Sequence, residues 1–298
     1  MKKKTRSIAV ITIFFVFMSL FWISAAFGWG RGHFYVIGTG PAGPQTATLQ
    51  ALETIAKMDT IIASERHLKL FQEYIGDKTS PFDPWTGFWD YKGKPFRELN
   101  EKEKKKFQKA RFQIRDERVA QIENMLAQGK DVGLLDSGNP CLFGPSHWYI
   151  EQFNPNDVIV IPGMGADAAA MAALGKSMIP SHDTRFVMQT APSFLTGPQD
   201  EDWNILEDLA KYPTTKILYM ALREPETLFA ELGKVYPSDM PCAVVFWAGY
   251  PDKQSVVKGT IANMAEKLTQ YKETYMGLVF IGRFLEGKPY ESAQKMRN

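Results

Sequence analysis

Short apolar runs rich in β-branched residues alternate along the chain with segments of helical periodicity. Runs of this kind predict strands over residues 34–37, 60–63, 132–136, 158–161, 185–190, 217–222, 242–248 and 278–284. The alternation is typical of an α/β fold. Pro162-Gly163 and an Ala-rich helix expected over 166–174 interrupt it. We therefore predict two α/β domains, residues 34–162 and 163–298, that meet in a cleft.

The interval 80–100 departs from this pattern, because prolines, glycines and aromatic residues follow one another closely in "SPFDPWTGFWDYKGKPFRELN". Such a segment is too apolar for a linker and too broken for a helix, so 82–96 is predicted to be a binding loop or lid. A long helix over about 98–127 follows, and Arg111 and Arg118 fall on its apolar stripe at helical spacing. The charge run 101–106 indicates a solvated face.

The N-terminus carries a basic start followed by an apolar run. Lys2, Lys3, Lys4 and Arg6 precede apolar residues 8–23, and small residues follow at 24–26. This order is typical of a signal peptide or a membrane anchor, so residues 1–28 are predicted to be one or the other. Because positive charges lead, the rest of the chain is expected outside the cytoplasm.

Composition excludes some classes of function. The 298 residues are 45% apolar, enough for a full core. Lys and Arg number 35 against 33 acids, and without the four leading basic residues the balance is 31 to 33, so no nucleic-acid partner is expected. Cys141 and Cys242 lack metal-ligand spacing and could form a disulfide only if the chain is exported. The scattered histidines are expected to be surface or satisfied polar residues, and no metal site is predicted.

The stretch from Gly38 to Gly43, "GTGPAG", is a literal G-x-G-x-x-G that follows an apolar run and precedes a helix pattern. One interpretation is therefore an NAD- or FAD-binding oxidoreductase, with Glu65 as the acid that binds ribose. Pro44 directly after the third glycine stiffens the helix entry, and Glu65 lies beyond the end of the next apolar run. A lone glycine motif of this kind is a weak signal.

A longer resemblance uses several motifs at once. "GTGPAGPQTATLQALETIAKMDTII", "GNPCLFG" after "VGLLDS", "IPGMGA" before the Ala-rich helix, "ILYMALRE", "VVFWAGYPDKQSVVKGTIANM" and "GLVFIGRF" are similar to the tetrapyrrole methylase family of S-adenosylmethionine-dependent methyltransferases. The resemblance covers about residues 34–284. It implies two α/β domains with a cofactor cleft between them, S-adenosylmethionine as cofactor, a tetrapyrrole-like substrate and a homodimer.

The same resemblance implies a set of cofactor contacts on strand-end loops, where Gly and Pro leave the backbone accessible. Carried over position by position, these contacts are Pro41, Ser137, Gly138, Asn139, Leu142, Gly165, Ala166, Met220 and Gly249. Two positions depart from the family pattern. Asn139 stands where the family has an acid, and Gly43-Pro44 replaces an Asp-Pro pair. The departures indicate either weaker cofactor binding or a branch with a different substrate.

"GNPCLFGPSH" also resembles, in part, a segment of the borosin peptide backbone N-methyltransferases, which lack the same acid. That resemblance implies a peptide substrate and places a catalytic arginine at Arg111, while a position held there by Tyr is Arg115. Two arginines one helical turn apart also suit the carboxylates of a tetrapyrrole. Alternatively, Arg111 is a structural helix arginine paired with Asp116 or Glu117.

The predicted export conflicts with a cytoplasmic cofactor. An exported, non-catalytic tetrapyrrole-binding protein that uses the aromatic segment 82–96 is therefore a further alternative.

Overall fold

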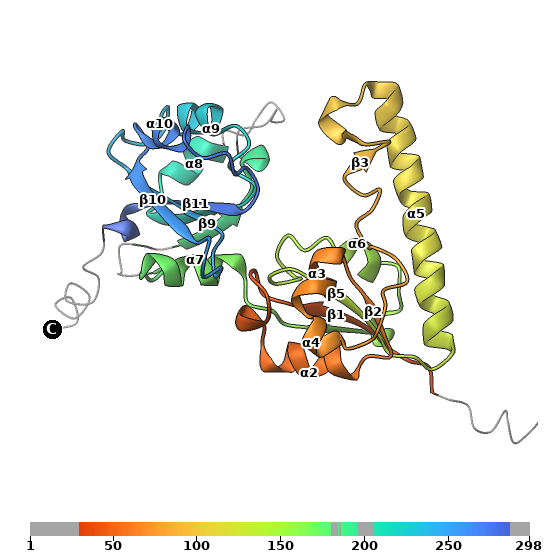
Figure 1. Ribbon diagram of the computed structural model, residues 1–298. Coiled ribbons are helices and arrows are strands. Elements are labelled where there is room, and N and C mark those ends of the chain that lie inside the picture. Colours follow the sequence, from red (N-terminus) through yellow and green to blue (C-terminus); the bar gives the residue numbers. More distant parts are fainter. Residues whose placement is uncertain (1–29, 180–183, 185, 196–204, 287–298) are drawn as a thin grey trace, which may run out of the picture.

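The computed structural model describes residues 30–179, 184, 186–195 and 205–286. Figure 1 shows two α/β halves that lie side by side, the first coloured red to yellow-green and the second green to blue. Each half is built around its own β-sheet, and the chain passes from one to the other after β6 (Val158–Ile161). The α/β class is as predicted, and the domain boundary at Pro162-Gly163 stays a prediction.

The first sheet is parallel throughout, with the strand order β2-β5-β1-β6. Its strands are β1 (Phe34–Gly38), β2 (Thr60–Ile62), β5 (Val132–Asp136) and β6 (Val158–Ile161). Since the strands are parallel, their carboxyl ends lie at one edge of the sheet. The loops that follow β1, β5 and β6 are therefore neighbours, although about 100 residues of chain separate the first from the second.

Helices cover both faces of this sheet. The helical elements of the first half are η1 (Pro44–Thr46), α2 (Leu49–Lys57), α3 (Glu65–Leu70), α4 (Gln72–Ile75), η2 (Phe96–Glu98), α5 (Glu101–Ala127), α6 (His147–Ile150) and η3 (Pro155–Asp157). On one face Ile55 of α2 and Ile75 of α4 pack against Ile37 and Leu135. On the other face α5 and α6 pack against Phe34 and Leu134. Alternate residues of the strands thus point into two separate hydrophobic cores, one on each face of the sheet.

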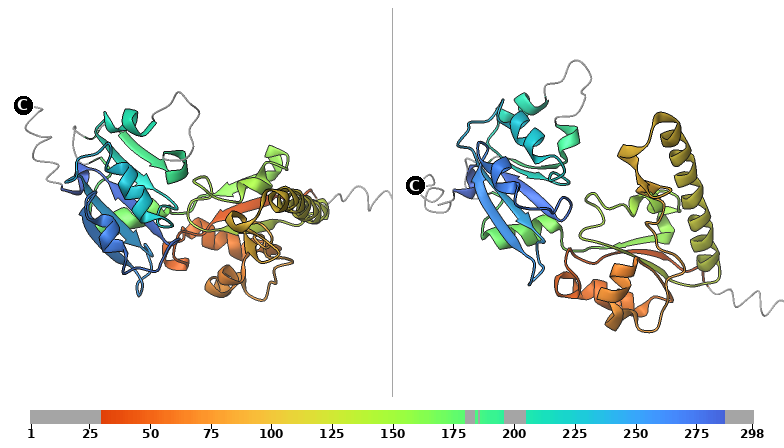
Figure 2. Two further views of the ribbon diagram at one scale, coloured as in Figure 1. Left: turned by 90° about the horizontal axis from the view of Figure 1, so that it is seen from above. Right: turned by 45° about the horizontal axis from the view of Figure 1, so that its top comes forward.

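The long helix α5 begins at Glu101, three residues later than expected, because Asn100 caps it. The Asn100 side chain accepts from the backbone N–H of Glu103, and the Glu103 carboxylate accepts from the backbone N–H of Asn100. The predicted loop before it contains a short hairpin, β3 (Asp90–Tyr91) and β4 (Lys94–Pro95), which periodicity missed. In Figures 1 and 2 this hairpin lies on the side of α5 nearer the second half.

The second sheet is mixed, with the order β10-β9-β11-β8-β7. Only the pair β7–β8 is parallel among its described pairings. Its strands are β7 (Phe186–Thr190), β8 (Thr214–Leu218), β9 (Pro241–Phe246), β10 (Ser255–Thr260) and β11 (Gly277–Ile281). The helical elements are α7 (Ala166–Leu174), η4 (Pro192–Phe194), α8 (Ile205–Ala210), α9 (Pro225–Leu232), α10 (Met264–Leu268) and η5 (Arg283–Leu285).

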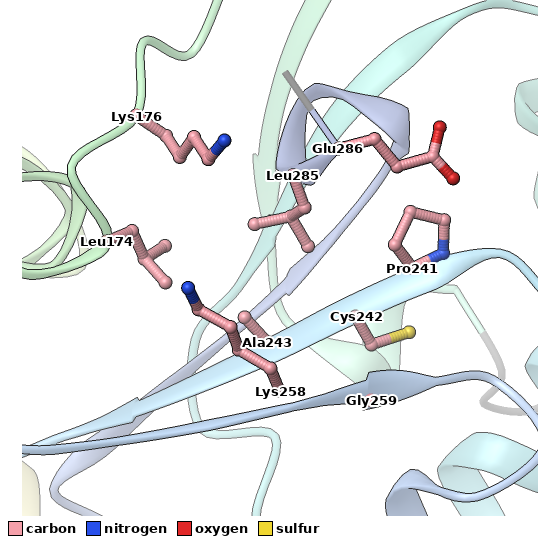
Figure 3. Close-up of a pocket in the computed structure, with 9 residues that line it drawn as sticks. All are labelled: Leu174, Lys176, Pro241, Cys242, Ala243, Lys258, Gly259, Leu285 and Glu286. Carbon is pink, nitrogen blue, oxygen red and sulfur yellow. The ribbon is translucent and has the colours of Figure 1, made fainter. Parts of the chain in front are cut away.

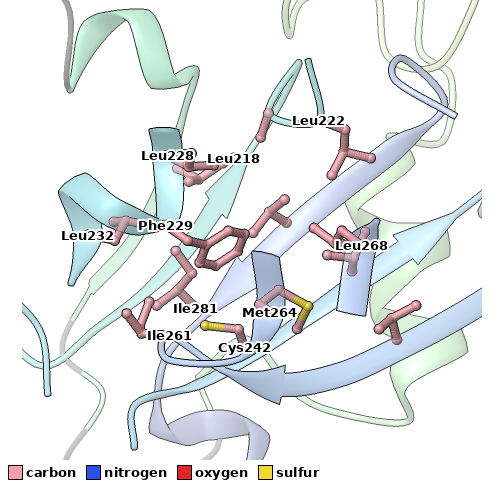
Figure 4. Packing of buried hydrophobic residues seen from close by; sticks show 14 of the residues in the cluster. Leu218, Leu222, Leu228, Phe229, Leu232, Cys242, Ile261, Met264, Leu268 and Ile281 are labelled. Atoms are coloured by element: carbon pink, nitrogen blue, oxygen red, sulfur yellow. The ribbon is translucent and has the colours of Figure 1, made fainter. Parts of the chain in front are cut away.

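Two cores also flank this sheet. On one face Leu218 and Ile281 pack against Phe229 of α9 and Met264 of α10, as Figure 4 shows. On the other face α7 lies over Ala243 and Phe280 and buries Ala169 and Ala170 there. The Ala-rich sequence of α7 permits this close helix-to-sheet approach because small side chains leave little between the two backbones.

Strand ends in the second half differ from those predicted. The predicted strand 217–222 is β8, which runs from Thr214 to Leu218. It starts earlier than predicted because Thr215 and Lys216 are buried in the sheet despite being polar. It ends earlier because Met220 has a φ of 55°, which a strand does not allow. The predicted strand 242–248 is β9, which ends at Phe246, before Trp247 with a φ of 51°. The predicted 278–284 ends at Ile281, before Gly282 at 146°. β10 was not predicted.

Cys141 is exposed, Cys242 is buried, and both are free thiols, so the disulfide considered from the sequence is not present. The predicted leader 1–28 lies outside the described residues. Within the described part of the chain, no helix is both long enough and apolar enough to cross a membrane.

Candidate functional site

Three glycines pack the strand-end loops of the first sheet against one another. A methyl group on Gly163, after β6, would lie 2.1 Å from the carbonyl oxygen of Gly138, after β5. It would also lie 2.6 Å from the carbonyl carbon of Gly38, at the end of β1. Gly40 and Gly138 form a bridge in which the Gly138 N–H donates to the Gly40 carbonyl at 2.9 Å. Only glycine fits at this meeting point.

Gly249 brings a loop of the second half to the same place. A methyl group there would lie 3.0 Å from Cγ2 of Thr46 and 3.3 Å from Cβ of Ala42, both on the first loop. It would also lie 3.7 Å from Cβ of Ala169 on α7. The Gly249 φ is 83°, and its N–H donates to Oε1 of Gln254 at 2.8 Å. The loops after β1, β5, β6 and β9 thus form one cluster, which we call the loop junction.

A second contact across the two halves joins the loop after β5 to the segment after β8. The rings of Phe143 and Tyr219 lie 5.0 Å apart. Phe143 and the neighbouring Met220 both have positive φ values, 57° and 55°, and both side chains are exposed. Non-glycine residues in this conformation are uncommon and concentrate at functional sites. The sequence motif located Met220 but gave no sign of Tyr219.

The remaining predicted cofactor residues belong to these same loops. Pro41 lies between Gly40 and Ala42, and Gly165 is the N-cap residue of α7, followed by Ala166 as its first residue. Asn139 and Leu142 form a turn in which Oδ1 of Asn139 accepts from the Cys141 N–H at 3.0 Å and the Leu142 N–H donates to the Asn139 carbonyl. The amide of Asn139 therefore closes the turn that an aspartate would close in the family pattern.

Polar side chains that the sequence did not single out support the junction from the second half. Tyr219 donates its hydroxyl to Oε1 of Gln189 at 2.9 Å, and Nε2 of Gln189 donates to Oδ2 of Asp167 at 3.3 Å. Burial, and then the nearby Asp167 carboxylate, raises the pKa of Tyr219, so its hydroxyl stays protonated. This chain links α7, β7 and the end of β8.

His67 was expected to be a surface or satisfied polar residue, and it is the second of these. It is buried beneath the first two loops, with Nε2 3.3 Å from Oγ1 of Thr39 and 3.1 Å from Oγ of Ser137. Its Nδ1 lies 3.0 Å from Oγ of Ser64. Burial, with a smaller contribution from Arg66, lowers the pKa of His67 to about 4, so the ring is neutral at pH 7.

Arg111 and Arg115 lie apart from the loops, in a group of aromatic rings on α5 and α6 that we call the arginine–aromatic cluster. The Arg111 guanidinium is 3.8 Å from the centroid of Trp148 and also contacts Phe88 and Phe107. Its Nε is buried without a hydrogen-bond partner, and burial lowers its pKa. The expected pairing of Arg111 with Asp116 or Glu117 is not seen. Arg115 pairs with Asp116 instead, at 2.7 Å.

Arg118, the other stripe arginine, has a structural environment. It is buried and donates to the carbonyls of Pro84 and Thr86, each at 3.0 Å, and to the hydroxyl of Tyr149 at 3.3 Å. These hydrogen bonds hold the aromatic segment 82–96 against α5. Phe88 of the segment is buried in the hydrophobic core. The segment is consequently packed at Phe88 and exposed at Trp89 and Phe96.

The first loop does not have the geometry of a dinucleotide site. In a dinucleotide site, the third glycine begins a helix whose N-terminus binds pyrophosphate. Here a 3-10 turn, Pro44–Thr46, follows Gly43, and the helix α2 starts only at Leu49, capped by the Thr48 side chain. Glu65 is the exposed first residue of α3. This arrangement disfavours the NAD or FAD interpretation.

Comparison with protein families decides the relationship. Residues 33–265 match the model of the Tetrapyrrole (Corrin/Porphyrin) Methylases. The chain belongs to this family. The family predicted from the sequence motifs is thereby confirmed, together with the predicted enzyme class, a methyltransferase that uses S-adenosylmethionine.

Several tetrapyrrole methylases are similar over much of the chain. The precorrin-4 C(11)-methyltransferase of Rhodococcus erythropolis is 31% identical over 180 residues, which are 58% of this chain and 71% of that protein. The cobalt-precorrin-4 C(11)-methyltransferase of Methanocaldococcus jannaschii is 25% identical over 258 residues, 86% of this chain and 89% of that protein.

Solved structures agree on the fold. A cobalt precorrin-4 methyltransferase of cobalamin biosynthesis matches with a TM-score of 0.65 at 19% identity, over 85% of this chain and 96% of that one. The uroporphyrin-III C-methyltransferase of Thermus thermophilus complexed with S-adenosyl homocysteine matches with a TM-score of 0.54 at 18% identity, over 86% and 99%.

The prediction of an exported or membrane-anchored domain is wrong. The relatives of this tetrapyrrole methylase are biosynthetic methyltransferases, and no described helix could span a membrane. The prediction relied on residues 1–28 alone. The exported binding protein and the NAD or FAD enzyme are not favoured by these relatives either, and the peptide substrate gains no support from them.

A small cavity lies away from the loop junction, beside the C-terminal end of α7 and the start of β9 (Figure 3). It measures about 160 Å³, and Leu174, Ala243 and Leu285 line it together with Lys176 and Lys258. No group of His, Cys, Asp and Glu that could hold a metal ion occurs among the described residues.

Proposed function

We propose that this methylase binds S-adenosylmethionine at the loop junction and transfers its methyl group to a carboxylated tetrapyrrole of the precorrin-4 type. The observation that carries the proposal is the meeting of the strand-end loops around Gly38, Gly138, Gly163 and Gly249. Four of the loops that the family resemblance named as cofactor contacts meet there, at the carboxyl edge of the first sheet. The segment with Met220 contacts the loop after β5 through the rings of Tyr219 and Phe143.

The residues of the junction fit the chemistry of the cofactor. S-adenosylmethionine has a sulfonium, an adenosine and an amino-acid tail but no phosphate, so it needs backbone carbonyls and amides more than a helix N-terminus. Gly138 has a φ of 73°, and the space where its side chain would be is free to 4.0 Å. Backbone groups on both sides of that glycine are therefore open to a ligand. The cofactor residues named from the family motifs, Pro41 to Gly249, are proposed contacts.

The substrate class is proposed from two observations. The similar proteins from Rhodococcus erythropolis and Methanocaldococcus jannaschii are named for methylation of precorrin-4 and cobalt-precorrin-4. Tetrapyrroles of this kind carry several carboxylates, and Arg111 has a buried Nε with no partner in the protein. Arginine binds a carboxylate with two parallel hydrogen bonds, so Arg111 and Arg115 are proposed to bind substrate carboxylates beside Trp148.

The reaction needs alignment more than acid–base chemistry. The bound cofactor supplies an electrophilic methyl group on a positively charged sulfur. A ring carbon of the tetrapyrrole would supply the electron pair for the new C–C bond, and the electrons of the broken S–C bond would leave with the sulfur as S-adenosylhomocysteine. The protein's part is to hold both partners in that line and to exclude water. Backbone loops held by mutual glycine contacts are suited to this, since they cannot rearrange freely.

Binding and turnover are tested separately. Isothermal titration of the purified protein with S-adenosylhomocysteine should give one site per chain with a Kd of micromolar order, and NADH or FAD should give no heat. Incubation with tritiated S-adenosylmethionine and enzymatically made precorrin-4 should transfer label to the tetrapyrrole. Cofactor affinity weaker than millimolar would refute the site. Binding without transfer to any tetrapyrrole would refute the substrate class.

The resemblance also implies a homodimer, and we propose this state for the enzyme. Light scattering at micromolar concentration should give twice the chain mass of 33.7 kDa. A mass of one chain across that range would contradict it.

A further inference from the structure

We propose that His67 is a positioning residue that holds the Ser137 hydroxyl as a hydrogen-bond donor toward the ligand at the loop junction. The proposal rests on the proposed function, because it assumes that the cofactor occupies this junction. His67 does not follow from the family motifs, and it lies on α3, behind the loops instead of on them.

The hydrogen bonds around Thr39 determine which nitrogen of His67 carries the proton. The Thr39 hydroxyl donates to the carbonyl oxygen of Asp136 at 2.9 Å. Its one proton is thereby used, so at 3.3 Å from Nε2 of His67 it can only accept. Nε2 must therefore bear hydrogen.

The other side of the ring is consistent with this tautomer. An unprotonated Nδ1 accepts from the Ser64 hydroxyl at 3.0 Å. Burial disfavours a second proton on the ring, and this keeps His67 neutral near pH 7. With Nε2 protonated and Nδ1 unprotonated, both nitrogens of the buried imidazole have hydrogen-bond partners.

The proton on Nε2 of His67 determines the role of the Ser137 hydroxyl. Its Oγ lies 3.1 Å from the same Nε2–H and so accepts from it. The proton of the Ser137 hydroxyl is then free to be donated. Ser137 is exposed next to Gly138, and its side chain makes no other hydrogen bond to the described residues. A hydroxyl that accepts from a buried donor and is open on its other side can donate to a ligand acceptor, such as a carboxylate, a ribose oxygen or an adenine nitrogen.

His67 adds a side-chain link between two loops that backbone hydrogen bonds also join, from the Thr39 N–H to the Asp136 carbonyl and from the Gly138 N–H to the Gly40 carbonyl. Thr39 follows β1 and Ser137 follows β5, and one ring nitrogen contacts both. Fixing both hydroxyls before the ligand arrives reduces the ordering that binding must supply. The role is therefore orientation and preorganisation, not contact with the reacting atoms.

The tautomer is tested directly in the wild-type protein. A long-range 1H–15N spectrum of the histidine rings, with His67→Gln used to assign the signal, should show His67 as the neutral Nε2–H form from pH 6 to pH 8. The chain has four histidines, so the spectrum is simple. The Nδ1–H form would overturn the proposal even if every variant proved unstable.

Its effect on binding is tested by calorimetry with S-adenosylhomocysteine on Ser137→Ala, His67→Leu and the double variant. Each single variant should bind about 10-fold more weakly, and the double variant should be no weaker, because one hydrogen bond is lost in all three. His67→Gln, whose amide N–H can replace Nε2–H, should stay within about 3-fold of wild type.

The outcomes separate this inference from the proposed function. If wild type binds and Ser137→Ala binds equally well, or if the losses in the double variant multiply, His67 is a structural residue and the inference fails alone. If wild type does not bind at all, both fail together. Thermal melting of each variant accompanies the titrations, since a structural histidine would lower the melting temperature without changing the affinity of the folded protein.

Discussion

The loop junction, which includes Gly249 of the second half, and the arginine–aromatic cluster of the first half are two different kinds of surface. At the junction the contacts are between backbones, and a side chain on Gly38 or Gly163 would clash with the backbone of the neighbouring loops. In the cluster the contacts are between a buried cation and aromatic faces, with Arg111 3.8 Å from the Trp148 centroid. The first surface has little freedom to change, whereas the second is defined entirely by side chains.

This difference indicates how a methylase can keep one cofactor while its relatives differ in substrate. Backbone positions that require glycine tolerate few substitutions, so the junction holds one ligand geometry. Side chains on a helix can be exchanged one at a time without moving the backbone, so the cluster can alter what it binds. The two surfaces should therefore respond independently to mutation, and the predictions below test that independence.

The largest effect is expected from Arg118→Leu, which removes a buried hydrogen-bond donor between α5 and the aromatic segment 82–96. The Thr86 carbonyl loses its Arg118 donor, and the Pro84 carbonyl and the Tyr149 hydroxyl, which stay bonded to each other, each lose one hydrogen bond. The free energy of unfolding should therefore fall by about 3 kcal/mol. Urea denaturation measures it. Arg115→Leu, which loses one ion pair with Asp116, is the control and should cost less than about 1 kcal/mol. Equal losses would show that Arg118 does not fasten the aromatic segment.

Lys216 provides a second buried cation, in the other half. Its pKa is lowered by burial to about 8, with Nζ near the Thr214 carbonyl and 4.7 Å from the Tyr236 ring centroid. Because the folded-state pKa is below the unfolded value of about 10.5, folding disfavours the charged form. Below pH 8 both states are protonated and the folded state bears the full penalty.

Lys216→Met should consequently stabilise the protein by about 2 kcal/mol at pH 7. The advantage should shrink as pH rises from 8 and disappear above about 10.5, where both states are neutral. Urea midpoints at pH 7, 8.5 and 10 measure the difference between variant and wild type. An advantage that does not change with pH would mean that folding does not lower the pKa of Lys216. Arg111, by contrast, should stay charged throughout, since arginine titrates far above this range.

Arg111→Lys keeps the charge but loses the two-pronged geometry. It should weaken binding of a carboxylated tetrapyrrole such as uroporphyrin III by about 1–3 kcal/mol while the Kd for S-adenosylhomocysteine stays unchanged. Fluorescence titration and calorimetry measure the two affinities. If Arg111→Ala keeps tetrapyrrole affinity and lowers the free energy of unfolding instead, Arg111 is a structural arginine and the assignment to substrate is wrong.

The smallest effect is expected at the junction itself. Gly138→Ala places a methyl group in open space and forces alanine to a φ of 73°. Cofactor affinity should fall by about 1 kcal/mol, with tetrapyrrole affinity unaffected. Gly93→Ala, at a φ of 77° on the β3–β4 hairpin and with nothing within 4 Å, controls for the backbone strain. A weaker tetrapyrrole affinity in Gly138→Ala would show that the two surfaces are coupled.

The sequence was a better guide to the first half than to the second. Buried parallel strands such as β5 and β6 are continuous apolar runs, and their predicted bounds match the structure. β8 contains Thr214, Thr215 and Lys216, which are polar but buried, so no apolar pattern marks its start. β10 lies at the edge of the sheet and has only two apolar residues, the adjacent Val256 and Val257, so its weak pattern was missed.

What the sequence by itself determined is the α/β class, the family and the loops that carry the cofactor motifs, because glycine and proline at strand ends have local backbone causes. What only the tertiary structure decided is which distant groups meet. Nothing in the order of residues pairs His67 with Ser137, Gly249 with Ala42, or Arg111 with Trp148. The chemical sequence of a chain records backbone preferences directly, whereas contacts between separate elements depend on the packing of every element between them.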